Sequence, residues 1–301
     1  MRSLWDDHDA RAFASDPLAL RVYTSRLIGQ DPSLVLHGGG NTSVKAKAPD
    51  LFGDVHDAVW VKGSGWDLAS IERAGFAPLR LDVVRRMADL HSLTDARMVE
   101  MLRAALLDPN APNPSVEAIL HAVIPFAFVD HTHADAVVTI TNTPKGVERI
   151  GEIYGNRIFI VPYVMPGFIL AKEVYGMTKD IDWAEVEGII LLNHGVFTFG
   201  DDARTSYERM IQVVTEAEDY LGTHAALAAD DEDGADAVTI RDDDLVELAR
   251  IRRAVAKSAG TPLIAALDSS PLHVAFSLRG DAGKIAARGP LTPDHVIRTK
   301  R

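Results

Sequence analysis

Two histidines separated by one residue, His131 and His133, are the side chains of this sequence best suited to binding a metal ion. They follow residues 127–130, whose apolar character predicts a short strand running into His131. In an extended chain, side chains at positions i and i+2 point to the same side. Both imidazoles can therefore be directed at one point, as two ligands of a single metal ion must be.

A third histidine and a carboxylate extend this pattern. Residues 188–193 form an apolar run ending in asparagine, which predicts a buried strand, and His194 follows at its end. A lone histidine in such a place is usually structural. Three histidines at two strand ends, with Glu117 nearby in sequence, match instead a catalytic zinc site that has three nitrogen ligands and one open position. We therefore predict a zinc site, with Mn²⁺ or Co²⁺ as alternative metals.

Two glycine-rich turns early in the chain are candidate anion-binding loops. The first has three consecutive glycines, residues 38–40, followed by Asn41, and the second reads Lys-Gly-Ser-Gly over residues 62–65. Such turns expose backbone amides, and their lysine, amide and hydroxyl side chains add further donors. The spacing is that of neither a P-loop nor a dinucleotide-binding fingerprint. Plain turns are the alternative interpretation.

The helices predicted around these residues have recognisable signals. A helix is expected over residues 115–124, with Ser115 as its cap and Glu117 in its first turn. His121, four residues after Glu117 on the same helical face, is interpreted as either structural or a support for the site. The longest helix is expected over residues 202–224, where apolar residues form one stripe.

The chain is expected to have three parts. Residues 1–225 form the main domain, residues 226–244 an acidic linker, and residues 245–301 a C-terminal extension. In the extension, residues 262–267 and 273–278 are predicted to be strands.

Composition limits the classes of function. The chain has 301 residues, of which 47% are hydrophobic and 25% charged, values typical of a globular protein. A net charge of −12 argues against nucleic acid or an anionic membrane as the main partner. The absence of cysteine excludes disulfides and thiolate ligands. With no signal peptide and no apolar run long enough to span a membrane, the expected compartment is the cytoplasm.

Five short motifs, taken in order, resemble those of the class II aldolase/adducin family of zinc sugar-phosphate aldolases. They are Gly-Gly-Asn-Thr-Ser, Lys-Gly-Ser-Gly, Pro-Ser-Val-Glu, His-Thr-His-Ala and Asn-His-Gly-Val. The similarity spans roughly residues 20–222, which identifies the main domain as a class II aldolase domain. It is strongest to the aldolase part of bifunctional rhamnulose-1-phosphate aldolase/lactaldehyde dehydrogenases, whose linker resembles residues 288–300. The chain is expected to end where their dehydrogenase begins.

This resemblance implies a fold and a set of roles. The fold is α/β, with three layers (α/β/α) around a central, mainly antiparallel sheet, and the assembly is a homotetramer with active sites at subunit interfaces. His131, His133 and His194 are implied as zinc ligands, and Glu117 as the catalytic acid/base. The positions that match phosphate-holding residues are Gly40, Asn41, Ser64, Gly65 and Ser115.

One position departs from the pattern of the simpler aldolases. Val116 stands where they have serine, which removes one hydroxyl from the phosphate-binding set. Either Lys62 compensates for this loss, or the bound anion is a carboxylate.

The implied activity is zinc-dependent cleavage of a ketose 1-phosphate, such as rhamnulose 1-phosphate, into dihydroxyacetone phosphate and an aldehyde. A tyrosine from a neighbouring subunit is the family's second acid/base, and the candidates here are Tyr154, Tyr163, Tyr175 and Tyr207. The alternatives are a pentulose-phosphate 4-epimerase, which usually has aspartate in place of Glu117, and a sugar-phosphate dehydratase. An adducin-like structural module would lack the three histidines.

Overall fold

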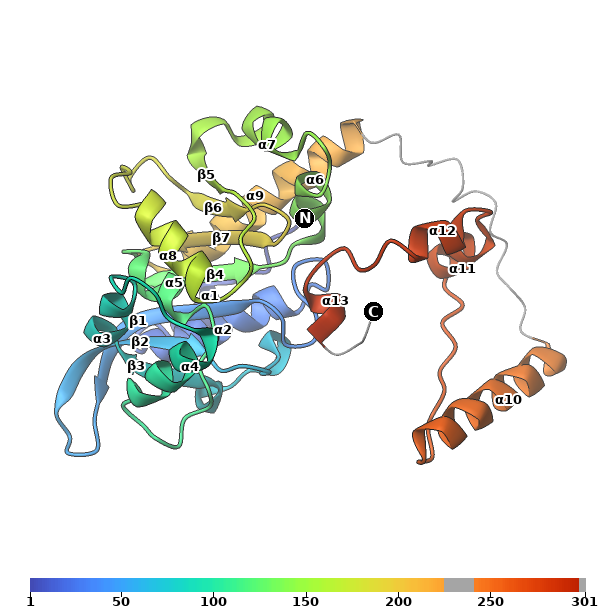
Figure 1. Ribbon diagram of the computed structural model, residues 1–301, viewed down its shortest axis with the longest axis horizontal. Coiled ribbons are helices and arrows are strands. Elements are labelled where there is room, and N and C mark those ends of the chain that lie inside the picture. Colours follow the sequence, from blue (N-terminus) through green and yellow to red (C-terminus); the bar gives the residue numbers. More distant parts are fainter. Residues whose placement is uncertain (225–240, 298–301) are drawn as a thin grey trace. The chain divides into compact units, whose positions relative to one another are not determined.

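A computed structural model describes residues 1–224 and 241–297 of the chain (Figure 1). The chain divides into two compact units. The large unit consists of Met1–Thr223 together with the segment that begins at Pro290, and the small unit includes the described residues 241–289. All the residues predicted to form the site lie in the large unit.

The large unit is built on a seven-stranded sheet with the strand order β3-β2-β1-β4-β7-β6-β5. The strands are β1 (Asn41–Pro49), β2 (Val55–Lys62), β3 (Phe76–Arg80), β4 (Phe128–Thr132), β5 (Ile158–Val161), β6 (Gly188–Leu191) and β7 (Gly195–Gly200). All neighbouring strands pair antiparallel except β5 and β6, which are parallel. The prediction of a mainly antiparallel central sheet is confirmed.

Helices connect the strands and cover the sheet (Figure 1). In the large unit they are α1 (Asp7–Arg11), α2 (Pro17–Gly29), α3 (Leu81–Met87), α4 (Asp95–Ala104), α5 (Ala118–Val123), α6 (Asp135–Thr141), α7 (Gly146–Tyr154), α8 (Phe168–Met177), α9 (Ala203–His224) and α13 (Asp294–Ile297), with short 3₁₀ turns at Leu68–Ser70, Arg73–Gly75 and Gly155–Arg157. The predicted long helix over residues 202–224 is confirmed as α9.

Two apolar cores separate the sheet from its helical layers. Strand β6 shows the principle, because successive side chains point to opposite faces. Ile189 and Leu191 pack in one core with residues of α3, α4, α5 and α8, whereas Ile190 packs in the other with residues of α2, α6, α7 and α9. The near-continuous apolar sequence of β6 follows from this double burial. The three-layer α/β/α fold is therefore confirmed.

The small unit is helical where it has regular structure. Its helices are α10 (Asp242–Ala259), α11 (Pro271–Leu278) and α12 (Ala282–Ala286). The strand predicted over residues 273–278 is wrong because these residues belong to α11, and residues 262–267 have no regular structure. Short apolar runs fit either state by periodicity alone. Pro271 at the first helical position favours the helix.

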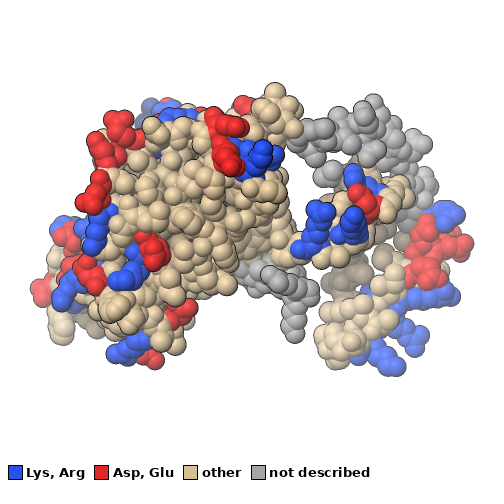
Figure 2. All heavy atoms as spheres, turned by 45° about the horizontal axis from the view of Figure 1, so that its top comes forward, with Lys and Arg blue, Asp and Glu red and all other residues tan. Residues whose placement is uncertain are grey.

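The surface of the large unit carries both signs of charge. Figure 2 shows acidic and basic side chains together along the left and upper margins of its visible face, with a broad area free of Lys, Arg, Asp and Glu between them. Among residues 1–224 and 241–297, no helix combines the length and the apolar character needed to cross a lipid bilayer.

Candidate active site

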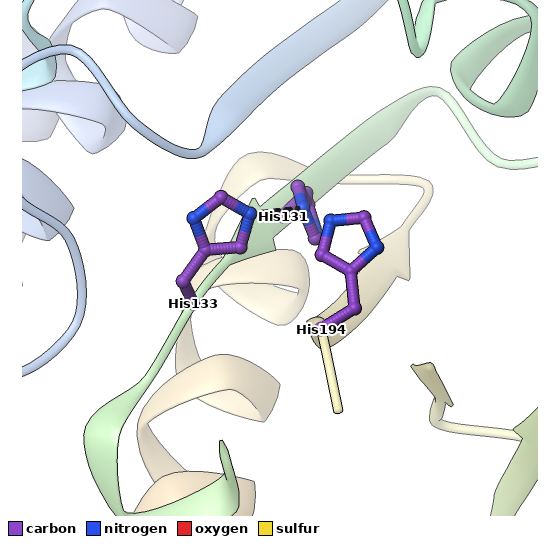
Figure 3. Close-up of side chains that lie close together, drawn as sticks. All are labelled: His131, His133 and His194. Atoms are coloured by element: carbon purple, nitrogen blue, oxygen red, sulfur yellow. Dashed lines mark hydrogen bonds between the residues drawn. The ribbon is translucent and has the colours of Figure 1, made fainter. Parts of the chain in front are cut away.

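The three predicted metal ligands meet at one end of β4 and β7 (Figure 3). His131 is the fourth residue of β4, and His133 follows the end of that strand. Their Nε2 atoms face each other at 3.1 Å, as the i, i+2 spacing predicted. The His131 ring stacks on Phe197 of β7, with centroids 4.1 Å apart, and its Nδ1 lies 3.1 Å from the Val196 carbonyl. That carbonyl can only accept, so Nδ1 donates and Nε2 is left with a free lone pair.

The turn between β6 and β7 presents His194. Asn193 adopts a left-handed conformation, with φ of 58°, which asparagine tolerates better than most residues. Its amide donates to the Thr141 carbonyl at 3.2 Å, which anchors the turn. Gly195 follows, where a Cβ would lie 2.3 Å from the Thr132 carbonyl oxygen. Only glycine therefore lets β7 approach the end of β4 closely enough to bring His194 to the other two histidines.

The geometry and environment of the cluster fit a divalent cation. One ligand atom from each of His131, His133 and His194 lies within 4.8 Å of the others, and all three side chains are buried. The Nδ1 of His194 and the Oε1 of Glu117 are buried with no hydrogen-bond partner among the described residues. Burial lowers the pKa of His194 and takes that of His131 well below its ordinary value, with neighbouring imidazoles adding to the effect. In His131 and His194 these shifts favour the neutral imidazole, which is the form that binds a metal.

Glu117 lies against this cluster. Its Oε2 is 3.4 Å from His131 Nε2, and its Oε1 is 3.4 Å from His194 Nε2. The predicted helix start is wrong: α5 begins at Ala118, and Glu117 is the residue before it. Pro114 lies in an isolated β-bridge and Ser115 accepts the Glu117 N–H at 3.2 Å, which holds this stretch out of the helix. The carboxylate is thus fixed on a tight turn, with 5% of the residue exposed.

A row of buried hydrogen bonds leads to Glu117. Asn41 Nδ2 donates to Glu117 Oε2 at 2.6 Å, so the amide oxygen of Asn41 is free to accept from His121 Nε2. On its other side, His121 Nδ1 lies 2.8 Å from the hydroxyl of Ser43. His121 therefore supports the site, which was one of the two interpretations of this residue. Asn41 was predicted to bind phosphate, but its side-chain amide donates to the Glu117 carboxylate.

The remaining predicted substrate-binding residues lie on adjoining segments. Lys62 is buried, and its Nζ donates to the Gly38 carbonyl of the glycine turn at 2.7 Å. The Lys62 carbonyl accepts from Ser115 N at 3.1 Å. Gly40 is buried beside the His131 backbone, whereas Ser64 and Gly65 are exposed in the second turn. The glycine turn (residues 38–40), the second turn (residues 62–65) and the stretch before α5 therefore lie close together.

A cavity of about 500 Å³ opens beside His194. Its walls come from four stretches of the chain, as its lining residues show: Asn142, Tyr163, Met165, Pro166, Asn193, His194, Pro290, Leu291, Thr292 and Pro293. Of the four candidate tyrosines, Tyr163 alone is among them. The Tyr154 hydroxyl donates to the Val213 carbonyl, that of Tyr207 accepts the Leu4 amide, and that of Tyr175 donates to an aspartate.

Asp294 reaches the site although no sequence pattern pointed to it. Its Oδ1 accepts a hydrogen bond from His133 Nδ1, and its Oδ2 accepts from the Leu36 amide at 2.7 Å. It lies 161 residues from His133 in the chain. The only signal was the similarity of residues 288–300 to a linker, which gave no reason to place a carboxylate at the histidines.

Comparison with protein families gives two matches. Residues 20–221 match the family described as Class II Aldolase and Adducin N-terminal domain. Residues 243–301 match a second description, Aldolase class II, second domain.

Individual relatives agree with the family match. An uncharacterized oxidoreductase of Bacillus subtilis (strain 168), YuxG, is 38% identical over 221 residues, which are 73% of this chain and 32% of YuxG. The chain therefore spans about a third of that relative. The N-terminal class II aldolase domain of a conserved Thermoplasma acidophilum protein is 42% identical, with a TM-score of 0.66, and the match covers 73% of this chain and 99% of that one.

A more distant structure shares the fold alone. The sugar-phosphate aldolase from Thermotoga maritima is 15% identical, with a TM-score of 0.50 over 70% of this chain and 97% of that one.

Proposed function

Because the chain belongs to the class II aldolase and adducin family, we propose that it is a zinc-dependent aldolase acting on a ketose 1-phosphate. Rhamnulose 1-phosphate is a representative substrate, and the products are dihydroxyacetone phosphate and an aldehyde. The observation that carries the proposal is the position of Glu117, whose two oxygens each lie 3.4 Å from a different histidine of the cluster. A carboxylate at a metal can move a proton at the carbon next to a polarised carbonyl.

The three histidines would hold the metal. Zinc, when bound by His131, His133 and His194, supplies Lewis acidity to the carbonyl oxygen of the substrate. The Glu117 carboxylate, held by the Asn41 amide, is not needed as a fourth protein ligand. This leaves an open position for substrate, as in catalytic zinc sites.

The chain's own groups account for the two proton transfers. In the direction of condensation, Glu117 removes a proton from C3 of dihydroxyacetone phosphate. The electron pair left at C3 forms the new bond to the aldehyde carbon, and the former aldehyde oxygen takes up a proton. We assign that second proton to the Tyr163 hydroxyl because this residue lines the cavity beside His194. Cleavage is the reverse sequence.

We assign recognition of the substrate anion to the two glycine-rich turns, residues 38–40 and 62–65. Ser64 and Gly65 are exposed there, and the second turn is tied to the stretch before Glu117 by the hydrogen bond from Ser64 N to the Asn113 carbonyl. We expect the phosphate to bind against this turn. We also expect a homotetramer, which light scattering during size-exclusion chromatography would check. The oxidoreductase activity in the name of YuxG is not part of the proposal, since two thirds of that protein have no counterpart here.

The test is an assay of dihydroxyacetone phosphate release from a panel of ketose 1-phosphates. Glu117→Gln preserves the shape of the side chain but cannot take a proton. We expect kcat to fall by about 10²–10⁴-fold, with zinc content unchanged. Exchange of the C3 proton of dihydroxyacetone phosphate with solvent needs no aldehyde and should also collapse. Wild-type exchange in Glu117→Gln would rule this residue out as the base.

Tyr163→Phe is the matched control. It should slow cleavage but leave proton exchange intact, because the phenol acts only on the aldehyde oxygen. A 4-epimerase would instead convert one pentulose phosphate into its isomer. If wild-type protein does this without releasing dihydroxyacetone phosphate, the activity is that of a 4-epimerase.

A further inference from the structure

Asp294 lies in a segment that returns to the large unit from far along the chain. It begins α13, and only 2% of the residue is exposed. Burying a carboxylate is costly unless its oxygens are hydrogen bonded. Here each oxygen has one donor: the imidazole of His133 for Oδ1 and the backbone amide of Leu36 for Oδ2. The carboxylate therefore joins a candidate metal ligand to the residue that opens the glycine turn.

The contact determines which nitrogen of His133 can bind a metal. A carboxylate offers only acceptors, so the shared proton belongs to His133 Nδ1. The lone pair of this imidazole is then on Nε2, the atom that faces His131 Nε2 at 3.1 Å. The same tautomer is imposed on His131 by the Val196 carbonyl. Both histidines thus have their second nitrogen occupied by an acceptor that orients the ring.

The glycine turn is shaped to admit this carboxylate. A Cβ built at Gly39 would lie 1.7 Å from Asp294 Oδ1, and the three nearest atoms all belong to the carboxylate. The φ of Gly39 is outside the left-handed region, so the backbone conformation alone does not require glycine. The absence of a side chain at position 39 is explained by the space that Asp294 needs.

We propose that Asp294 is a positioning residue for the metal centre, which orients His133 for metal binding and fastens the C-terminal segment over the glycine turn. This inference rests on the proposed function, because it assumes that the three histidines bind zinc. A carboxylate that accepts from a ligand histidine fixes its ring and increases its basicity. The segment would also contribute a wall of the cavity beside His194, through Pro290–Pro293.

The main test measures zinc affinity by competition with a chromophoric chelator, using the 301-residue chain. Asp294→Ala should weaken zinc binding by about 10–100-fold. It should also change the visible absorption spectrum of the Co²⁺-loaded protein, because His133 loses its orientation. Asp294→Asn keeps one acceptor oxygen but can serve only one of the two donors, so its zinc affinity should be intermediate.

A second variant reaches the same contact from the other side. Gly39→Ala should displace the carboxylate without altering either hydrogen-bonding group, and it should weaken zinc binding as Asp294→Ala does. In the double variant the second substitution should add little, because both act through one contact. Full additivity would overturn the proposal.

His295→Ala is the control for general loosening of the segment. This exposed side chain hydrogen bonds to Thr292 within the segment, and zinc affinity should stay at the wild-type value. Wild-type zinc affinity and Co²⁺ spectrum in Asp294→Ala would overturn the positioning role while leaving the proposed function standing. Faster turnover of Asp294→Ala at unchanged zinc affinity would also overturn the positioning role, since the Asp294 carboxylate would then act by hindering the binding of the substrate anion. A wild-type chain that takes up no zinc overturns both.

Discussion

At the scale of single residues, the hydrogen bonds around Glu117 all run in one direction. Asn41 donates to the carboxylate, His121 Nε2 donates to the amide oxygen of Asn41, and the Ser43 hydroxyl donates to His121 Nδ1. This order requires a neutral His121 protonated on Nε2. Burial supports that state, since it takes the pKa of His121 well below its ordinary value. Asn41 is therefore committed to orienting the Glu117 carboxylate.

Asn41→Ala and Ser64→Ala should have different kinetic effects. Removing the Asn41 amide leaves Glu117 unoriented, so kcat and the rate of C3 proton exchange should fall. Loss of a hydrogen bond to a charged group, about 1.5–3 kcal/mol, corresponds to a fall of roughly 10- to 150-fold. Ser64→Ala should instead raise KM for phosphorylated substrates, with kcat nearly unchanged. Steady-state kinetics on both variants would check this. If Asn41→Ala changed KM alone, the predicted role of Asn41 in phosphate binding would be favoured over a role in orienting Glu117.

The sequence was sufficient to predict which residues meet where their positions depend on local spacing. The i, i+2 pair His131 and His133 and the strand-end His194 meet as predicted. The contacts of Asn41 with Glu117 and of Asp294 with His133 were not predictable, because they join residues 76 and 161 positions apart. Such contacts depend on strand register and on the path of the C-terminal segment.

At the scale of elements, the site depends on how closely β4 and β7 approach. Antiparallel pairing places Thr132 opposite Val196, and the turn carrying His194 lies just beyond. Gly195 is what permits this approach. It lies within reach of both His131 and His133, since a Cβ there would be 3.0 Å from an atom of each ring.

Gly195→Ala should therefore disturb both stability and metal binding. The added methyl would meet the Thr132 carbonyl oxygen at 2.3 Å, which requires the backbone to move. We expect a loss of about 1–3 kcal/mol in the free energy of unfolding, with weaker zinc binding. Gly151→Ala in α7 is the control, because among the described residues no atom beyond its chain neighbours and the backbone of its own helix lies within 4 Å of the new methyl. It should stabilise by about 0.5–1 kcal/mol. Equal urea midpoints for the two variants would contradict the close-packing argument.

Element type was predictable where the apolar pattern is long. The stripe of α9 and the doubly buried β6 were recognised from periodicity. The start of α5 was misplaced because Ser115 is not its cap. The Ser115 hydroxyl accepts a hydrogen bond from the Glu117 amide in a turn that precedes the helix. The strand expected over residues 273–278 is a helix, since six apolar residues do not distinguish the two states.

At the scale of the whole molecule, the large unit combines parts that are distant in sequence. The described residues from Pro290 onward belong with Met1–Thr223 rather than with the intervening small unit. Composition and motifs divide a chain into consecutive stretches. The expected division at residues 225 and 245 therefore did not assign the C-terminal segment to the main domain. The structure brings the segment back to the histidines through the contacts of Asp294.

The buried imidazoles make the stability of the unit depend on pH. Burial is the main cause of the lowered pKa of His121; His131, Lys45 and Arg21 lower it further, while Glu117 opposes them. In the unfolded chain the ordinary value of 6.5 applies. Between the lowered pKa and 6.5 the unfolded chain binds more protons, so stability rises with pH across this window and is lost on acidification below 6.5. The slope for one imidazole is up to about 1.4 kcal/mol per pH unit.

His121→Gln removes this titration while keeping a polar side chain between Ser43 and Asn41. Urea unfolding of zinc-free protein at pH 7.5, 6.5 and 5.5 (about one pH unit on either side of the ordinary histidine value) should show a steeper loss of stability for wild type than for the variant. His131 and His194 also have a lowered pKa, so the variant keeps part of the slope in the same direction. The difference between the two proteins isolates His121. Parallel curves over this range would mean that folding does not lower the pKa of His121, and a neutral His121, on which the one-directional hydrogen bonds to Glu117 depend, would then lack support.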